Sequence, residues 1–250
     1  MSLKLYSKVE NLKKKIKNNK FTLGGWIQSG SPFVSEVMSN TGYEWLVADL
    51  EHGNFSKDNL AECIRGILLG NSIPFVRLKN NSKSEIQDSL DTGAMGLILP
   101  NIQSEKELKK SIEHSRWPPY GIRGVGFSRA NLFGKLFKNY QKFSNKIIIV
   151  AMIESLEAVN NLESICKVKG LDAILIGPYD LSSSLNIPGK FEHKLFKSTL
   201  KKIKDICKKN KITIGIHQVF PDYQKLQKLK RDGFSFIPYG MDVTLLQNIK

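Results

Sequence analysis

The stretch that decides the fold is Ile147-Ile-Ile-Val-Ala-Met-Ile-Glu154, together with the later stretch Ala173-Ile-Leu-Ile-Gly-Pro-Tyr-Asp180. Runs this apolar and this rich in β-branched side chains predict strands buried on both faces, as in a parallel sheet. Each run ends at an acidic residue. Parallel strands leave a sheet at the same end, so Glu154 and Asp180 are expected together at the carboxyl edge, where α/β proteins place their active sites.

These two carboxylates suggest a metal site. Hard oxygen ligands that converge at one edge suit a divalent cation such as Mg²⁺ or Mn²⁺. The alternative is that Glu154 and Asp180 only cap the helices that follow them, since acidic residues are common at helix starts. The two runs by themselves leave both interpretations open.

Outward from these runs, apolar strand patterns alternate with amphipathic helical patterns along the chain. The predicted strands are Thr22–Gln28, Trp45–Leu50, Ile73–Leu78, Gly96–Pro100, Lys146–Ile153, Asp172–Gly177, Ile212–Ile216 and Phe234–Tyr239. The predicted helices are Pro32–Thr41, Lys57–Leu69, Lys83–Thr92, Glu105–Ser115, Leu156–Val168, His193–Lys209 and Pro221–Arg231.

This alternation predicts βα units and a parallel sheet. Eight such units in a chain of 250 residues match an α/β fold of the (β/α)₈ TIM-barrel type. A doubly wound open sheet is the other possibility, but it needs a glycine-rich phosphate loop after the first strand, and that fingerprint is absent. No linker or repeat interrupts the chain, so one domain over residues 1–250 is expected.

Composition restricts the class of protein. No stretch approaches the roughly 18 apolar residues of a membrane span, and residues 1–20 lack the apolar segment of a secretory signal. Three cysteines without metal-like spacing are expected to be buried and reduced, which favours the cytoplasm. The net charge of +15 comes mostly from scattered lysines, and no nucleic-acid-binding motif accompanies it. We therefore expect neither a nucleic-acid nor a membrane partner.

Two further residues are candidates for catalysis. His52 lies in Asp49-Leu-Glu-His-Gly53, just after the second strand, where a histidine is a natural general base. Arg77 ends the third strand and is costly to bury without an anionic partner. Its partner is either a barrel carboxylate in a salt bridge or a substrate carboxylate or oxyanion.

Other candidates concern the walls of the site. Trp26 is expected to line a pocket or to pack, and Met152 shares the inner face of its strand with Glu154. The long segment from Trp117 to Arg129, rich in Gly, Pro and Arg, is expected on the active rim. There Arg123 or Arg129 would contact the distal end of a substrate, bound to the same or to a neighbouring subunit.

Taken in order, these motifs resemble the HpcH/HpaI aldolase family. The resemblance runs from about Phe21 to Leu246, and its most specific pieces are Asp49–Gly53, Gly121-Ile-Arg-Gly-Val-Gly126 and Gly177-Pro-Tyr-Asp-Leu-Ser182. It implies a (β/α)₈ barrel of the phosphoenolpyruvate/pyruvate type, assembled as a hexamer with exchanged C-terminal helices. It also implies a class II, metal-dependent aldolase, a carbon–carbon lyase.

The implied reaction is reversible cleavage of a 4-hydroxy-2-oxo acid to pyruvate and an aldehyde. By resemblance, Glu154 and Asp180 bind a divalent ion (Mg²⁺, Mn²⁺ or Co²⁺), and the amides of Tyr179 and Asp180 cradle the pyruvate carboxylate. Arg77 matches the residue that stabilises the enolate. His52 matches the base on the aldol hydroxyl, and Asp91 matches the acid that makes this histidine more basic.

The chain departs from the family pattern at two places. Many members have Gln where this chain has Met152, and that Gln contacts the substrate. After Arg77, Lys79-Asn-Asn81 stands in place of a Pro-Trp-Asn stretch. Two alternatives to the aldolase remain: a related 2-oxo acid lyase or decarboxylase on the same barrel, and a barrel that binds an oxo acid without turnover. Val243–Lys250 is expected to form a helix that packs on a neighbouring subunit.

Overall fold

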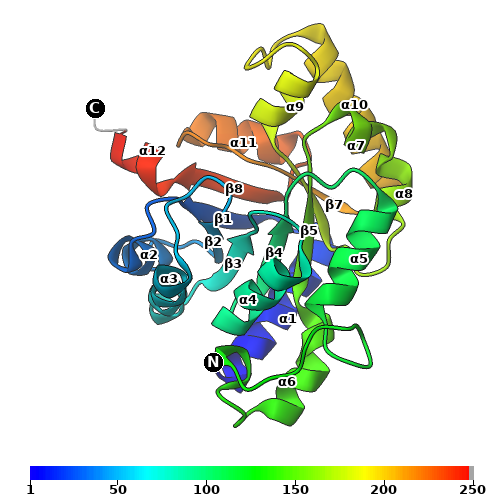
Figure 1. Ribbon diagram of the computed structural model, residues 1–250. Helices are drawn as coiled ribbons and strands as arrows, with labels where there is room; N and C mark the ends of the chain where they lie inside the picture. Colours follow the sequence, from blue (N-terminus) through cyan, green and yellow to red (C-terminus); the bar gives the residue numbers. More distant parts are fainter. Residues whose placement is uncertain (248–250) are drawn as a thin grey trace.

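Eight parallel strands close into a barrel in which each strand pairs with the next and the last pairs with the first (Figure 1). The computed structural model describes residues 1–247. The strands are β1 (Thr22–Ile27), β2 (Trp45–Asp49), β3 (Ile73–Arg77), β4 (Gly96–Leu99), β5 (Ile148–Ile153), β6 (Ala173–Ile176), β7 (Thr213–Ile216) and β8 (Phe236–Met241). The predicted (β/α)₈ barrel is thereby confirmed, and all eight predicted strands are present.

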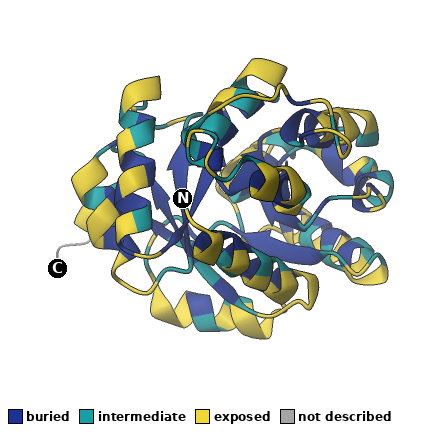
Figure 2. Ribbon diagram, turned by 90° about the horizontal axis from the view of Figure 1, so that it is seen from below, coloured by how far each residue is buried: buried dark blue, intermediate teal, exposed yellow. Residues whose placement is uncertain are grey.

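Helices surround the barrel and leave the strands buried between them (Figure 2). They are α1 (Leu3–Lys17), α2 (Pro32–Ser39), α3 (Lys57–Leu69), α4 (Lys83–Thr92), α5 (Glu105–Ser115), α6 (Phe137–Phe143), α7 (Leu156–Asn160), α8 (Leu162–Cys166), α9 (Pro178–Ser184), α10 (Lys194–Lys209), α11 (Tyr223–Arg231) and α12 (Asp242–Gln247), with 3₁₀ turns η1 (Arg129–Asn131) and η2 (Ser144–Lys146). In the described part of the chain, no helix is long and apolar enough to span a membrane.

The barrel interior is filled by aromatic rings from three strands. Trp45 of β2 stacks on Phe236 of β8 with ring centroids 4.1 Å apart, and Phe75 of β3 lies beside both. Gly24 and Gly96 face these rings: a Cβ atom at Gly24 would come within 2.3 Å of Trp45, and one at Gly96 within 2.5 Å of Phe75. The glycines therefore make room for large side chains that fill the barrel.

Helix α1 closes the amino end of the barrel, a role that the sequence analysis did not assign. Its buried face consists of Leu5, Tyr6, Val9, Leu12 and Ile16. Its polar side chains reach residues that precede the strands: Lys13 contacts Asp172 before β6, and Lys15 contacts Glu44 before β2. The carboxyl end of the barrel is left for the candidate site.

One predicted helix is divided. The segment expected as a single helix over Leu156–Val168 forms α7 and α8, with Asn161 between them. The Asn161 side chain donates to the carbonyl of Gln103, 2.8 Å away. A side chain held by a neighbouring loop in this way gives the backbone an alternative to continuing the helix.

Candidate active site

The predicted site residues gather at the carboxyl ends of the strands. Arg77 is the last residue of β3, and Glu154 directly follows β5. Asp180 stands in the first turn of α9, which begins two residues after β6, and His52 lies in the loop after β2. Since the strands are parallel, these four side chains share one rim of the barrel, as the sequence predicted.

Arg77 is held by a two-pronged ion pair with Asp49. The two residues are direct neighbours in the register of β2 and β3. Arg77 Nε donates to Asp49 Oδ1 at 2.7 Å, and Nη2 donates to Oδ2 at 2.6 Å. Both side chains are buried, so each charge has a partner whose loss would be costly. This pair fixes the plane of the guanidinium at the rim.

The ionisation of this pair follows from its contacts. Burial favours the neutral form of Arg77, but the bonds and charge of Asp49, with a further ion pair to Glu51 at 2.9 Å, raise the pKa of Arg77. Burial also opposes ionisation of Asp49, yet the bonds from Arg77 lower the pKa of that carboxyl. Both groups are therefore charged at neutral pH.

Glu154 is buried at the rim, with 8% of its surface exposed. Its Oε1 accepts the backbone N–H of Asn101 at 2.6 Å. Burial, reinforced by the charges of Glu51 and Asp180, raises the pKa of Glu154 to about 7 against the opposing bond from Asn101. A Cβ atom at Gly177 would come within 2.8 Å of Glu154 Oε2, so the glycine after β6 provides the space that this carboxylate occupies.

Glu51, Glu154 and Asp180 form an acidic cluster. Burial raises the pKa of Glu51, and Asp180 adds to this effect as it does at Glu154. Like charges brought together in this way are stabilised by a cation, and carboxylate oxygens are the donors that Mg²⁺ and Mn²⁺ prefer. The residue types fit a divalent ion, although the side chains of residues 1–247 include no group of three or more His, Cys, Asp or Glu arranged to hold one.

The structure places Trp26 beneath the site and not along its wall. The ring is completely buried. Its Nε1 donates to Asp49 Oδ2 at 3.0 Å, and the Arg77 guanidinium lies 5.1 Å from the ring centroid. Of the two expectations for Trp26, a pocket wall or packing, the structure agrees with packing, because the side chain is enclosed by the residues that it positions.

The remaining rim residues differ in their exposure. Met152 is almost completely buried beside Gly177, where it presents an apolar surface next to Glu154. Tyr179 is half exposed, and its ring packs edge-to-face on Phe191 with centroids 5.1 Å apart. His52 is exposed, and its backbone N–H donates to Asp49 Oδ1 at 3.3 Å. The ring of His52 is thus free to approach a bound molecule.

Three predicted residues do not lie on this rim within the chain. Asp91 is near the end of α4, which returns the chain to the amino end of the barrel, and its neighbours are Arg123, 3.9 Å away, and Ser128. Arg123 is buried and donates to Tyr140 Oη at 2.8 Å. Arg129 begins η1, which packs on α4.

The expectation that the Arg-rich loop belongs to the active rim is therefore wrong, and topology explains why. The loop follows α5, not β4. A helix in a parallel barrel carries the chain back to the amino end, so everything between α5 and β5 lies opposite the rim of Glu154 and Asp180. Any contact of Asp91, Arg123 or Arg129 with a substrate requires a second copy of the chain.

Two further residues at strand ends support the site. Gln28 donates to Asp49 Oδ2 at 3.2 Å, and His217 stacks on Trp26 with centroids 4.4 Å apart. Burial, with Arg77 nearby, lowers the pKa of His217 to about 3, so its imidazole is neutral. Each of these residues stands at the end of a strand. That position is the only signal in the sequence that points to them.

A (β/α)₈ barrel with several carboxylates and an ion-paired arginine at its carboxyl rim is a kind of enzyme site that can bind a cation together with an anionic substrate. Comparison with known proteins identifies the class more closely. The chain belongs to the HpcH/HpaI aldolase/citrate lyase family, whose model matches residues 22–248.

Curated relatives and solved structures agree with this assignment. A 2-keto-3-deoxy-L-rhamnonate aldolase of Shigella dysenteriae is 30% identical over 239 residues, covering 93% of this chain and 87% of the relative. The crystal structure of an HpcH/HpaI aldolase/citrate lyase family protein from Burkholderia cenocepacia is 26% identical, has a TM-score of 0.90 and covers 95% of each chain. The citrate synthase SbnG is also 26% identical, with a TM-score of 0.83 and coverage of 94% and 92%.

Proposed function

We propose that this protein is a class II pyruvate aldolase that reversibly cleaves a 4-hydroxy-2-oxo acid to pyruvate and an aldehyde. The observation that carries the proposal is the pairing of opposite charges at one rim: the guanidinium of Arg77, clamped by Asp49, beside the acidic cluster of Glu154, Glu51 and Asp180. Arg77 offers positive charge to an anionic substrate, and the cluster offers oxygen ligands to a cation. The relatives named as aldolases support the same reaction class.

The cofactor of this reaction is a divalent cation, Mg²⁺, Mn²⁺ or Co²⁺. Glu154 and Asp180 would hold it, with water and substrate oxygens as the remaining ligands, because two carboxylates alone do not fill its coordination shell. When bound, the ion acts as a Lewis acid that withdraws electrons from the ketone of the oxo acid. Glu154 must be ionised to bind it, so binding displaces the proton that burial otherwise retains near neutral pH.

The residues divide the remaining tasks by charge and position. Arg77, rigid in its ion pair, stabilises the negative charge that develops on the enolate oxygen. The amides of Tyr179 and Asp180, in the first turn of α9, point their N–H groups toward the substrate carboxylate. His52, exposed at the mouth, removes the proton from the aldol hydroxyl when the carbon–carbon bond breaks.

Asp91 serves this histidine only if it comes from another copy. Within the chain it faces Arg123 at the amino end of the barrel, and burial raises its pKa there against the charge of Arg123. We infer that the amino end of one copy meets the carboxyl rim of the next. The loop that carries Arg123 also exposes the apolar side chains of Ile122, Val125 and Phe127. These side chains give the contact between copies a surface that excludes water.

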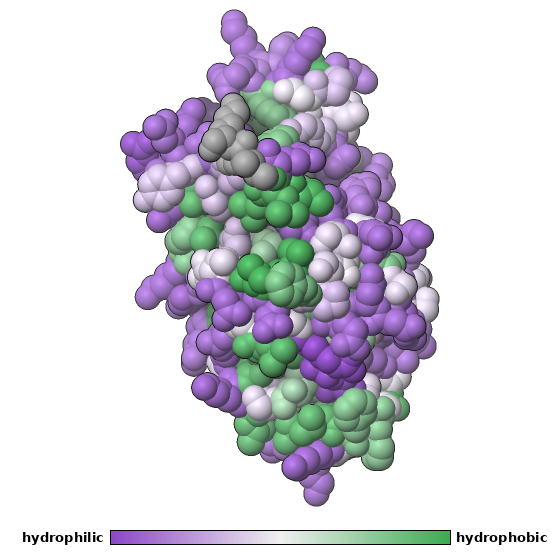
Figure 3. All heavy atoms as spheres, turned by 90° about the vertical axis from the view of Figure 1, so that its left-hand side faces the viewer, coloured by the Kyte–Doolittle hydropathy of each residue, from purple (hydrophilic) through white to green (hydrophobic). Residues whose placement is uncertain are grey.

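The C-terminal helix supports an assembly as well. An apolar hollow of about 550 Å³ beside α12 is lined by Phe33, Val34, Val37, Leu245 and Leu246 among others. Figure 3 shows apolar side chains gathered next to the end of the described chain. We propose a homo-oligomer, a hexamer by family resemblance, in which copies exchange C-terminal helices over this surface. The predicted helix Val243–Lys250 corresponds to α12, and residues 248–250 lie outside the described part.

One observation favours a second candidate. Met152 cannot form the hydrogen bonds of the Gln that many aldolases of the family have at this position. The citrate synthase SbnG is as similar to this chain in sequence as the Burkholderia family member is, at 26% identity. A related 2-oxo acid lyase or decarboxylase on the same site is therefore the alternative. The protein is proposed to act in the cytoplasm, which agrees with three free, buried cysteines.

The test is an aldol-addition screen with pyruvate, a panel of hydroxy-aldehydes and Mn²⁺ or Mg²⁺, with product detected by mass spectrometry. The aldolase forms a 4-hydroxy-2-oxo acid with at least one aldehyde, loses activity in EDTA and recovers it when the ion is restored. Decarboxylation of oxaloacetate without any aldol product would favour the alternative. Full activity after removal of all metal would refute the metal-dependent mechanism.

A further inference from the structure

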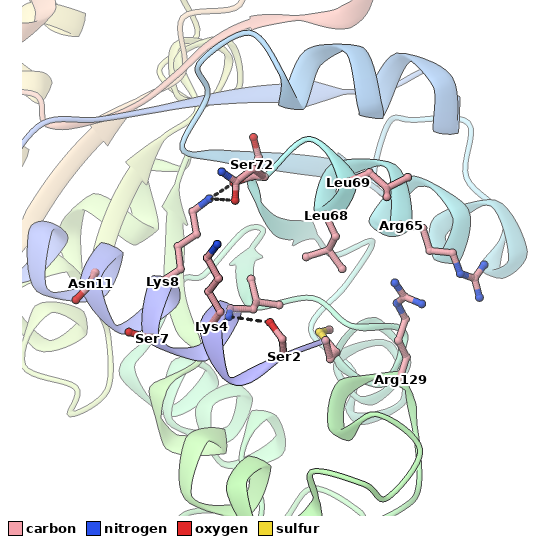
Figure 4. A pocket seen from close by; sticks show the side chains of 13 residues that line it. Ser2, Lys4, Ser7, Lys8, Asn11, Arg65, Leu68, Leu69, Ser72 and Arg129 are labelled. Atoms are coloured by element: carbon pink, nitrogen blue, oxygen red, sulfur yellow. Dashed lines mark hydrogen bonds between the residues drawn. The ribbon is translucent and has the colours of Figure 1, made fainter.

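A second hollow lies at the amino end of the barrel, opposite the candidate active site. It has a volume of about 910 Å³ and lies between the start of α1, the end of α3 and the loop that carries Arg129. Figure 4 shows its walls: Lys4 and Lys8 come from α1, and Arg65 extends from α3 near the upward-pointing Arg129. The four cations thus come from three segments that are distant in the sequence.

Among residues 1–247, no acidic side chain lines this hollow. In residues 1–247, Lys4, Lys8 and Arg129 have no acidic group within salt-bridge distance, and Arg65 pairs only with the exposed Glu62. A second basic hollow in the same molecule is different: its lining includes Asp172 and Glu113, and Lys13 pairs with Asp172 at 2.6 Å. The charges of the Arg129 hollow are therefore compensated only from outside its lining, by Glu62 beside Arg65 and Arg129 and by Glu44 near Lys8.

Arg129 is the least satisfied of the four cations. Its Nε atom is buried and has no hydrogen-bond partner among the described residues. Burial lowers the pKa of Arg129, and the charge of Arg65 lowers it further against the opposing charge of Glu62. A half-buried guanidinium next to a second one is unfavourable unless an anion lies between them.

The start of α1 adds to the same imbalance. This helix of 15 residues has no acidic residue in its first turn, and Lys4 stands there instead. A cation at the positive end of a helix is unfavourable, whereas an anion is stabilised there by the free N–H groups. Lys8 is held in place by its bond to Asn71 Oδ1 at 3.0 Å. Burial, with Lys4 nearby, lowers the pKa of Lys8 against the charge of Glu44.

We propose that this hollow binds a small phosphorylated metabolite. The phosphate lies between Arg65 and Arg129 at the start of α1, because a phosphate has the charge and the oxygen geometry that paired guanidinium groups match. The organic part packs against Leu68 and the exposed Leu69, which form the apolar side of the lining. Within one copy the site lies at the end of the barrel opposite the aldolase rim, and its ligand ties α1, α3 and the Arg129 loop together.

Calorimetric titration and thermal unfolding with inorganic phosphate and with AMP test this proposal on the intact protein. Both probes should bind, AMP more tightly, and both should raise the unfolding temperature. The double variant Lys4→Gln/Arg129→Gln should bind AMP about 10- to 100-fold more weakly. The matched control Lys201→Gln/Arg231→Gln removes the same charges from exposed positions on α10 and α11 and should bind as the wild type does.

Each other outcome overturns a part of the proposal. Equal weakening in the control would show general charge attraction and no site. Phosphate binding as tight as that of AMP would exclude the organic subsite on Leu68 and Leu69. Absence of binding by both probes at millimolar concentration would exclude the site. If Lys4→Gln/Arg129→Gln does not fold, Arg129→Lys replaces it: this variant keeps the charge but loses the planar fork, so unchanged AMP affinity would also overturn the proposal.

Discussion

The two ends of this barrel have opposite charge imbalances. At the carboxyl rim, burial raises the pKa of Glu154 and of Glu51, the charge of Asp180 adds to both effects, and Arg77 is the cation that opposes them. At the amino end, the hollow beside Arg129 brings four cations together without a carboxylate in its lining. Elsewhere in residues 1–247 a minority of the basic residues form ion pairs, as Lys13 does with Asp172.

This difference in charge indicates that the two ends of the barrel bind ligands of opposite charge. Charges of one sign brought together in a partly buried place cost free energy that the fold does not recover by itself. A ligand of the opposite sign removes the cost. The carboxyl rim is thus ready for a cation with an anionic substrate, and the amino end is ready for an anion, although the chain as a whole has a net charge of +15.

The largest effect is expected when the carboxylate of Glu154 is removed from the carboxyl rim. Glu154→Gln should abolish metal-dependent aldol cleavage, a loss of at least about 1,000-fold, because a neutral amide is a poor ligand for a hard cation. Metal affinity in the wild type should fall as the pH drops below about 7, since a proton competes for Glu154 once the pH is below its raised pKa. Calorimetric Mn²⁺ titrations at about pH 6 and about pH 8 measure this change.

Glu157→Gln is the matched control for this prediction. Glu157 stands three residues further on, exposed in the first turn of α7, and lies outside the acidic cluster. It should leave both metal affinity and its pH dependence unchanged. If Mn²⁺ binds Glu154→Gln as tightly as the wild type, the assignment of this carboxylate as a metal ligand is incorrect.

A second prediction separates the tasks of Arg77 and His52. Arg77→Ala should slow both aldol cleavage and the exchange of pyruvate methyl protons with D₂O by about 100- to 1,000-fold, because both reactions pass through the enolate. It should also destabilise the fold by about 3–5 kcal/mol, since Asp49 is left buried and unpaired. His52→Ala should slow cleavage by a similar factor but leave most of the exchange.

Proton exchange followed by NMR and cleavage followed by a pyruvate assay measure these two effects on the same preparation. Circular dichroism confirms that each variant is folded. Equal loss of exchange and cleavage in His52→Ala would mean that this histidine also acts on pyruvate, and the division of tasks would then be wrong.

The sequence predicted the barrel well because its signal is local. A few neighbouring residues are enough to predict a strand from an apolar run such as Ile147–Ile153. The same holds for a helix with a serine cap, such as α3 or α5. Helix α1 was not predicted, although Leu5, Val9, Leu12 and Ile16 have helical spacing. Its many lysines make the segment strongly polar, and that composition is also typical of a solvated tail. The break at Asn161 depends on a bond to Gln103, and such a distant contact has no local pattern.

The site was predictable only in part, because some of its contacts join residues that are distant in the sequence. The residues at strand ends, Glu154, Asp180 and Arg77, follow from topology. Supporting contacts across the barrel, such as the bond from Trp26 to Asp49, depend on register and packing. The Arg129 loop lies at the amino end because α5 precedes it and returns the chain there, whereas the glycines and arginines of the loop carry no signal of that location.

The last and smallest prediction asks whether the two ends of neighbouring copies meet. Asp91→Ala should lower cleavage by about 10- to 100-fold, the usual effect of losing a residue that supports a catalytic group. Mixing this variant with His52→Ala, after dissociation and reassembly, should restore about one quarter of the sites, because random pairing joins an intact His52 with an intact Asp91 from another copy.

The mixture of His52→Ala with Arg77→Ala is the control, since these residues share one rim of the same copy and no exchange of partners restores an intact pair. It should remain as inactive as its components. Activity is read from pyruvate release, and reassembly is followed by light scattering. If the Asp91 mixture gains nothing although mixed oligomers form, Asp91 does not reach His52 across copies. Its contacts with Arg123 and Ser128 then account for it as a structural residue of the amino end.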